Sequence, residues 1–282
     1  MTHFILTRFN LKLWTKDKSN IPVQTEVWLN KRFDLFETYC LPSIINQTNQ
    51  NFKWICLFDI DTPCAYKSKI TEYIIRCPNF HPYYLNKKET INYLEYFKDC
   101  IKKLRGGDND AIITTYLDND DCLRCDYIES VQRLAYTASH KTIISFEYGL
   151  QYFINLGVVN HIPYPNNHFL TLIETADNLD FKTVWSINHY FLSSYRKDYN
   201  ILTIRDKKEM WIEVIHNNNV DNDAKMTLKF YPILSPQCLH AYGLNINLNP
   251  IRSIIVFIFC FYPRFFRQII RRIMNKIKYE AH

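Results

Sequence analysis

Glycine is scarce in this sequence. The 282 residues include only five glycines, which lie at positions 106, 107, 149, 157 and 243. Rossmann and Walker A loops need several closely spaced glycines, because only a residue without a side chain lets the backbone approach a phosphate group. The sequence therefore excludes a dinucleotide-binding dehydrogenase of the Rossmann type and a P-loop kinase.

Cysteine pairs are scarce as well. Nine cysteines are scattered along the chain, and only Cys122 and Cys125 have the CxxC spacing. A structural zinc site needs a second pair, or a cysteine–histidine pair at ligand spacing, and the sequence has neither. We expect ordinary reduced thiols in a cytoplasmic protein, since no signal-peptide pattern precedes the first strand-like run.

Positive charge is missing from most of the chain. The net charge is +6, and the segment from Arg252 onward accounts for all of it, with seven basic residues and one acidic residue. A nucleic-acid-binding protein carries its basic residues across the fold or on one of its faces. We therefore expect a nearly neutral body with a basic tail, and no nucleic-acid partner.

Apolar residues (47%) and aromatic residues (16%) are abundant, which indicates a globular chain with one substantial core. Strand-like runs alternate with helix-like segments in the first half. The predicted strands are 3–9, 52–58, 80–85 and 111–117, and the predicted helices are 25–47 (with a kink or restart at Pro42), 66–75, 90–104 and 126–137. This order predicts an α/β fold with a doubly wound, mostly parallel sheet, in which ligands bind beyond the carboxyl ends of the strands.

The second half is less regular. Two strands are predicted within 141–159, around Gly149, and a third within 210–216. The segment 184–195 is aromatic and helix-like. No linker is evident before residue 245, so we expect residues 1–245 to form one catalytic body.

Asp118-Asn119-Asp120-Asp121 follows the strand 111–117 directly. Neighbouring carboxylates repel one another, and a divalent cation relieves that repulsion. Magnesium and manganese accept carboxylate and phosphate oxygens together, so this segment is a candidate clamp for a metal–diphosphate. The alternative is a solvated acidic turn, because Asp and Asn are common turn residues.

Two further side chains at the ends of apolar runs are candidates. His216 ends the strand-like run WIEVIH, and imidazole is an acceptable manganese ligand. Glu174 ends HFLTLIE, where a carboxylate would serve as general base toward an acceptor hydroxyl. The alternatives are a hydrogen-bonded structural histidine and an ordinary surface glutamate.

Asp59-Ile60-Asp61-Thr62 allows a second enzyme class. Haloacid-dehalogenase phosphatases also begin with a strand followed by Asp-x-Asp, in which the first aspartate, here Asp59, is the nucleophile. Their threonine or valine stands two places after the second aspartate, whereas Thr62 follows Asp61 at once. The phosphatase stays an alternative, as does an inactive transferase fold that serves as a scaffold in glycan assembly.

Four blocks of the sequence resemble the rhamnosyltransferase family of bacterial glycosyltransferases. They are FILTRFN, WLNKRFDLFETYCLPSIINQTNQNFKW, YLDNDDCLRCDYIESVQ and WIEVIHNNNVDN, and they span roughly residues 3–225. The resemblance implies a GT-A type fold, with a nucleotide-binding half at about 1–140 and an acceptor half at about 141–245.

The resemblance also implies roles for individual residues. Thr7 and Arg8 would line the nucleotide pocket, and Asp59 would approach the base or the ribose. Asp118 would lie near the ribose or the metal, and Asp120 would bind the metal as the second aspartate of the DxD motif. His216 would stand where many GT-A enzymes have a late metal-ligating histidine. An arginine that the family pattern has before the DxD motif is replaced here by Thr115-Tyr116, so a sugar-phosphate contact is lacking or comes from elsewhere, as from Arg124.

Residues 246–282 form a separate basic, amphipathic tail. The apolar run 253–262 is ten residues long, too short to span a bilayer, which needs about 20. Beyond Pro263, apolar residues recur every four positions from Phe265 onward, with Phe266, Ile270 and Met274 beside them, and basic residues fill much of the opposite face. This pattern predicts a helix at an anionic membrane surface, and the alternative is a helix that packs on the body or on a second subunit.

Together, these features predict a sugar transfer from a nucleoside diphosphate donor to a hydroxyl of a cell-surface glycan or lipid-linked acceptor. The expected cofactor is a divalent metal ion, Mn²⁺ or Mg²⁺. The expected location of the protein is the cytoplasm, at the inner face of the cell membrane.

Overall fold

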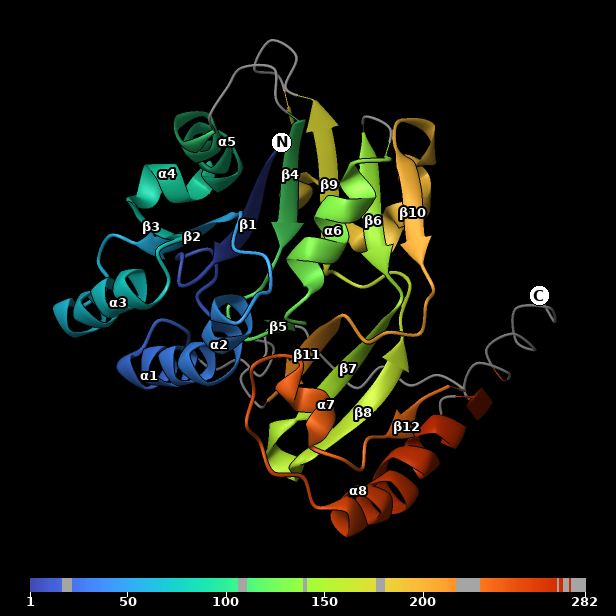
Figure 1. The fold of residues 1–282 in the computed structure, drawn as a ribbon. Helices are drawn as coiled ribbons and strands as arrows, with labels where there is room; N and C mark the ends of the chain where they lie inside the picture. The colour runs from blue at the N-terminus through green and yellow to red at the C-terminus, as the bar shows by residue number, and fades with distance from the viewer. Residues whose placement is uncertain are drawn as a thin grey trace.

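Two β-sheets form the centre of the protein (Figure 1). The structure is a computed structural model, and it describes residues 1–16, 22–105, 111–138, 141–175, 181–216, 229–267, 269–270 and 274. Gly106 and Gly107, which follow the helix predicted at 90–104, lie outside the described residues.

The larger sheet has seven strands in the order β10-β6-β9-β4-β1-β2-β3. Their bounds are β1 Thr2–Arg8, β2 Lys53–Asp59, β3 Phe80–Leu85, β4 Ala111–Tyr116, β6 Thr142–Phe146, β9 Leu170–Thr175 and β10 Asn200–Ile204. Strand β9 is antiparallel to both of its neighbours, and all other neighbours in this sheet are parallel. The predicted α/β class with a mostly parallel sheet is confirmed, and strands from both predicted halves of the body share this sheet.

Helical segments cover both faces of the large sheet, which explains why its strands are continuous apolar runs. Alternate residues of β1 point to opposite faces, so Ile5 belongs to one core cluster and Phe4 and Leu6 belong to the other. The first cluster includes side chains from α1, α3 and α6, and the second includes side chains from α5. These helices are α1 Glu26–Leu35, α3 Cys64–Arg76, α5 Tyr93–Leu104 and α6 Tyr127–Ala135.

The helix expected to kink or restart at Pro42 continues through that residue. α1 begins after Thr25, whose side chain accepts a hydrogen bond from the Trp28 N–H, and it passes into a π-helical segment, Phe36–Cys40, and then into α2, Leu41–Ile45. Proline is tolerated in the first turn of a helical segment, where an N–H would lack its usual partner. The widened π turn lies just before it.

Three other segments differ in detail from their predictions. The helix expected at 90–104 is divided at Asn92 into α4, Lys87–Ile91, and α5. The segment expected to be one helix at 184–195 forms two 3-10 helices, Val184–Ser186 and His189–Lys197. Gly149 lies inside a strand and not between two strands. The ring of Trp211 packs where a Cβ would be, so only glycine fits at this position.

The smaller sheet has the order β12-β8-β7-β11-β5. Its strands are β5 Cys122–Leu123, β7 Tyr148–Phe153, β8 Val158–Pro163, β11 Trp211–Ile215 and β12 Tyr231–Pro232. β5 follows Asp121 at once and pairs antiparallel with β11. The acidic loop therefore runs from the large sheet into the small one, and two distant parts of the sequence meet there.

The C-terminal helices lie beside the small sheet (Figure 1). A 3-10 segment, Ile154–Leu156, joins β7 to β8, and α7 is Gln237–His240. α8, Pro250–Val256, continues through a π-helical segment, Phe257–Phe261, into helical residues 262–267. Among the described residues, no helix is long and apolar enough to cross a membrane.

Candidate functional site

The acidic loop between β4 and β5 is held in the protein interior. Asn119 fixes its middle, because its amide group donates a hydrogen bond to the Phe9 carbonyl (2.8 Å) and its carbonyl oxygen accepts one from Arg32 (3.1 Å). Asn119, Asp120 and Asp121 are all buried. The loop thus places carboxylates at the carboxyl end of the parallel strands, where α/β proteins bind ligands.

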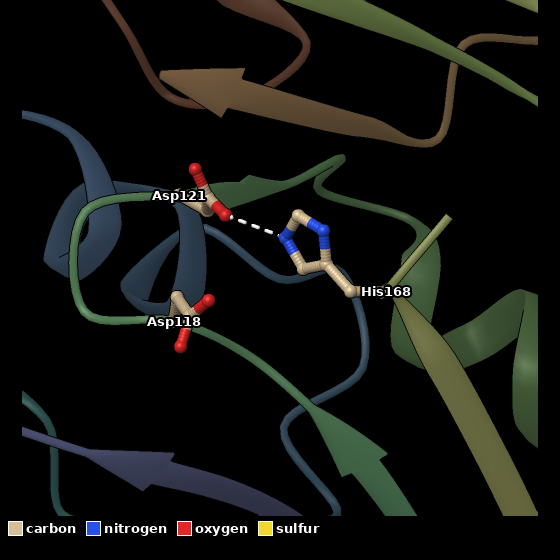
Figure 2. Close-up of side chains that lie close together, drawn as sticks. All are labelled: Asp118, Asp121 and His168. Atoms are coloured by element: carbon tan, nitrogen blue, oxygen red, sulfur yellow. Dashed lines mark hydrogen bonds and ion pairs between the residues drawn. The ribbon is translucent and has the colours of Figure 1, made fainter. Parts of the chain in front are cut away.

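Asp121 and His168 form a buried pair. One carboxylate oxygen of Asp121 accepts the Val214 N–H (2.9 Å), and the other lies 2.8 Å from Nε2 of His168, which stands just before β9 (Figure 2). Burial raises the pKa of Asp121 to about 7, although the hydrogen bond from His168 opposes this shift. Burial lowers the pKa of His168, but the Asp121 carboxylate outweighs that effect and raises it. The two groups therefore titrate as a pair, which retains a proton to a higher pH than an exposed aspartate would.

Asp118 lies across from this pair (Figure 2). The Tyr116 hydroxyl lies within hydrogen-bond distance of both carboxylate oxygens of Asp118, at 3.0 and 3.1 Å, and burial raises the pKa of Asp118. One ligand atom from each of Asp118, Asp121 and His168 lies within 4.8 Å of the other two. Among the described residues, Asp118, Asp121 and His168 are the one group of three potential ligand residues that lie close enough together to bind a metal ion.

Asp120 is occupied by two other partners. Its Oδ2 lies 2.7 Å from Arg32 Nη1, on α1, and 2.9 Å from Nε2 of His216, which follows β11. Burial opposes ionisation of Asp120, but Arg32 and His216 outweigh it and hold the pKa of Asp120 well below its usual range. Asp120 is therefore ionised and ties the acidic loop to α1 and to the small sheet.

A pocket of about 430 Å³ opens above the acidic loop. Its walls include the rings of Trp14, Trp28 and Tyr190, and Asp118 and His168 are among its polar lining. Ligand pockets of roughly 300–1,000 Å³ with aromatic walls and a few polar groups are typical of small-molecule sites.

Arg8, at the end of β1, brings a cation to this pocket. Its guanidinium lies 4.1 Å from the ring centre of Trp185, 5.2 Å from that of Tyr93 and 5.1 Å from that of Trp14. Cation–π contacts of this kind hold a guanidinium in place without neutralising it. The ring of Trp185 also packs on Tyr116, the tyrosine that contacts Asp118, with ring centres 4.1 Å apart.

The model of the family described as "Putative rhamnosyl transferase" matches residues 14–228, which is more than half of the chain. The chain belongs to this glycosyltransferase family. No protein with a curated description matches the sequence.

Three solved structures of TarS from S. aureus are similar to this glycosyltransferase. One TarS structure has a TM-score of 0.45 and 11% sequence identity, and the match covers 90% of the present chain and 41% of TarS. A TarS 1-349 structure in complex with UDP has a TM-score of 0.44 and 12% identity, with 90% and 68% covered. The same TarS portion in complex with UDP-GlcNAc has a TM-score of 0.45 and 12% identity, with 90% and 69% covered. The glycosyltransferase thus spans less than half of the first of these structures.

The residues predicted from the family resemblance fall into two groups in this glycosyltransferase. Arg8, Asp118 and Asp120 line the pocket, and His216 reaches Asp120 behind it. Thr7 and Asp59 are not in the pocket lining. Thr7 is fully buried, and its hydroxyl accepts a hydrogen bond from the Trp54 indole.

Asp59 is also withdrawn from solvent. Its Oδ1 lies 3.0 Å from the Lys12 ammonium and accepts the Asp61 N–H, while its own N–H donates to Asn10. These contacts fix the turn after β2, a structural role that does not require contact with a base or a ribose.

The structure does not bring Glu174, predicted as the catalytic base, to the pocket. In the antiparallel pair of β9 and β4, Glu174 lies opposite Ile112, near the start of β4, whereas Asp118 follows the end of β4. Glu174 therefore lies at the other edge of the large sheet, several strand residues away from the pocket. Arg124 is likewise not in the pocket lining, and its guanidinium pairs with Asp126.

Sequence reasoning missed several residues of the site, and it assigned no individual ligand role to Asp121. His168, Arg32, Trp28 and Tyr116 all line the pocket, and His168 and Arg32 contact the acidic loop. One signal was available, since Trp28 and Arg32 are four residues apart and therefore share one side of a predicted helix. His168 has no such signal, because it reaches Asp121 only through the path of the folded chain.

Proposed function

We propose that this glycosyltransferase moves a sugar, a rhamnose in view of its family, from a nucleoside diphosphate donor to a hydroxyl of a glycan or lipid-linked acceptor. The observation that carries the proposal is the group of Asp118, Asp121 and His168 beside a pocket with aromatic walls and a fixed arginine. Aromatic rings suit a nucleoside base, a cation suits a diphosphate, and clustered carboxylates suit the divalent metal that accompanies a diphosphate.

The donor set fits a divalent cation. Two carboxylates and one imidazole, from Asp118, Asp121 and His168, are ligands that manganese accepts. A cation held by these side chains would supply a Lewis acid that neutralises the negative charge of the leaving diphosphate. Tyr116 would orient Asp118, and Val214 would orient Asp121, through the hydrogen bonds already described.

The other pocket residues have roles in binding. Arg8 would pair with a phosphate oxygen, because its guanidinium packs against aromatic rings and has no ion pair with a carboxylate among the described residues. The indole N–H of Trp28 is buried and lacks a hydrogen-bond partner among the described residues, so it is a donor for a ligand oxygen. Asp120 would act as a fixed anchor between Arg32 and His216.

Titration calorimetry with UDP and dTDP, each with and without Mn²⁺, tests this function. We expect binding that depends on Mn²⁺, and we expect its loss in the variant Asp118→Ala. The matched control is Asp61→Asn, which changes an exposed aspartate that follows another strand. Metal-independent binding, or equal loss in the control, would contradict the proposal.

A phosphatase assay separates the alternative. The burial of Asp59 and its contact with Lys12 favour a structural aspartate. We expect no hydrolysis of p-nitrophenyl phosphate by the purified protein. Hydrolysis that disappears in Asp59→Asn would favour the haloacid-dehalogenase class instead.

A further inference from the structure

The C-terminal helix has one side that packs on the body. Asn249 caps α8, since its side chain accepts the Arg252 N–H (3.0 Å). Ser253 and Phe261 are almost fully buried, and the Phe261 ring lies 4.7 Å from the ring of Phe153 on β7. Phe257 and Phe265 also pack against the core. These contacts fix which side of the helix faces outward.

The outward side carries a line of large apolar residues that we call the outer stripe. The outer stripe consists of Ile251, Ile254, Ile255, Ile258, Phe259, Tyr262, Phe266, Ile270 and Met274, all of which are exposed. Phe259 is 73% exposed and Ile251 is 70% exposed. Exposed apolar residues that are scattered singly are ordinary, but a contiguous row indicates an interaction surface.

The helix geometry keeps the outer stripe on one side. Ile254, Ile258, Tyr262 and Phe266 are spaced by four residues, and a spacing of four drifts around an α-helix of about 3.6 residues per turn. The wider π turn at Phe257–Phe261 offsets this drift. The structure thereby corrects the predicted lipid-facing line, because Phe265 faces the body and Phe266 faces outward.

Basic residues accompany the outer stripe. Arg252, Arg264 and Arg267 are exposed on the same helix. The sequence has no aspartate or glutamate from Ala224 to Tyr279, so nothing in this segment of the chain neutralises them. An apolar row with an arginine flank suits the boundary between the acyl chains and the phosphate groups of an anionic bilayer.

A second copy of the chain fits this surface less well. A paired copy would bring its own arginines against the first set, and like charges at an apolar contact oppose association. Figure 1 shows α8 at the side of the molecule away from the large sheet, where a flat surface could approach it.

We infer that the outer stripe binds the surface of an anionic lipid bilayer, with the helix axis parallel to the membrane and the arginines at the lipid phosphates. This inference does not rest on the proposed sugar transfer. It gives the predicted peripheral membrane association a defined set of contact residues.

Flotation of the full-length protein with vesicles tests the inference. We compare phosphatidylcholine vesicles with vesicles that also contain phosphatidylglycerol. Binding should occur with phosphatidylglycerol, and high salt should weaken it.

The double variant Phe259→Ser, Phe266→Ser should reduce the partition constant by about 10-fold or more, because each ring loses its apolar burial. The double variant Arg264→Gln, Arg267→Gln should reduce it by about 25-fold, since each basic residue contributes about five-fold.

The matched control is Ile75→Ser with Ile91→Ser, which removes two exposed apolar side chains from α3 and α4. This control should float like the wild type. Thermal unfolding of each variant, followed by circular dichroism, establishes that the fold is retained. The inference is overturned if the wild type fails to float with phosphatidylglycerol, if the phenylalanine variant floats unchanged, or if the control loses as much. The inference would also be overturned if the wild type forms a dimer without vesicles and the phenylalanine variant does not. That result would assign the outer stripe to a second copy of the chain.

Discussion

The two edges of the large sheet each hold a buried carboxyl group, and burial raises the pKa of both Asp121 and Glu174 to about 7. Their surroundings differ. Asp121 has His168, a backbone N–H and two neighbouring aspartates in its loop, whereas Glu174 accepts the Lys182 N–H at one oxygen and has no partner among the described residues at the other. A raised pKa therefore marks burial at both edges, and only the neighbouring groups distinguish a ligand site from an isolated acid.

The largest expected effect is on stability, through the buried ion pair of Arg32 and Asp120 at the pocket. Arg32→Met leaves Asp120 buried beside His216 without its guanidinium, and breaking a buried ion pair in this way costs roughly 3–5 kcal/mol. Urea unfolding should show this loss in the free energy of unfolding. The exposed neighbour Lys31→Met, on the same helix, should change stability by less than about 0.5 kcal/mol. Equal stability of the two variants would contradict the assigned pairing.

The comparison of Asp118 with Glu174 predicts a large loss of activity at one end of the sheet and almost no change at the other. Asp118→Asn should lower metal-stimulated hydrolysis or transfer of a nucleotide sugar by about 100-fold, because it weakens the candidate ligand set. Glu174→Gln should leave this rate within about two-fold, since the side chain lies away from the pocket. A donor screen over nucleotide sugars provides the assay. A large loss in Glu174→Gln would restore its role as the base.

The buried Glu174 predicts a stability that depends on pH. The folded-state pKa of Glu174, about 7, exceeds the ordinary value of 4.5. Its contribution to the free energy of unfolding is therefore fully present below pH 4.5 and is lost as the pH rises through 7. Glu174→Gln should remove this loss and should be more stable than the wild type at pH 8, by about 3 kcal/mol. Urea unfolding at pH 5 and pH 8 measures it. A variant that is less stable at pH 8 would show that the ionised carboxylate is stabilised in the fold.

The smallest expected effect lies in the pocket wall. Trp28→Phe keeps a ring but removes the indole N–H that we assign to a ligand oxygen. The loss of one hydrogen bond of about 1 kcal/mol should weaken nucleoside diphosphate binding by about five-fold. Calorimetry with UDP and Mn²⁺ measures this change, and unchanged affinity would place the indole outside the bound ligand.

Local patterns predicted much of the fold. The strands 80–85 and 111–117 and the helix 66–75 were found within two residues at each end, because each element carries its own apolar periodicity. The acidic loop was found for the same reason, since its aspartates are contiguous and follow a strand. Its partners were beyond reach, because His168 lies 47 positions from Asp121 and Arg32 lies 88 positions from Asp120.

The placement of Glu174 away from the pocket has a specific physical cause. The sequence showed the run that ends at Glu174 only as a short apolar segment, and in the structure it forms β9. The direction of a strand within its sheet is not encoded in its alternation of side chains. Because β9 is antiparallel to β4, its carboxyl end lies at the edge away from the pocket.

The central claim is that the edge with Asp118, Asp121 and His168 holds a divalent cation together with a nucleoside diphosphate. Electron paramagnetic resonance of Mn²⁺ titrated with the protein and UDP measures this directly, because bound Mn²⁺ loses the signal of the free ion. We predict binding by the wild type and by Glu174→Gln, and its loss in Asp118→Asn. Unchanged Mn²⁺ binding in Asp118→Asn, or its loss in Glu174→Gln, would contradict the claim.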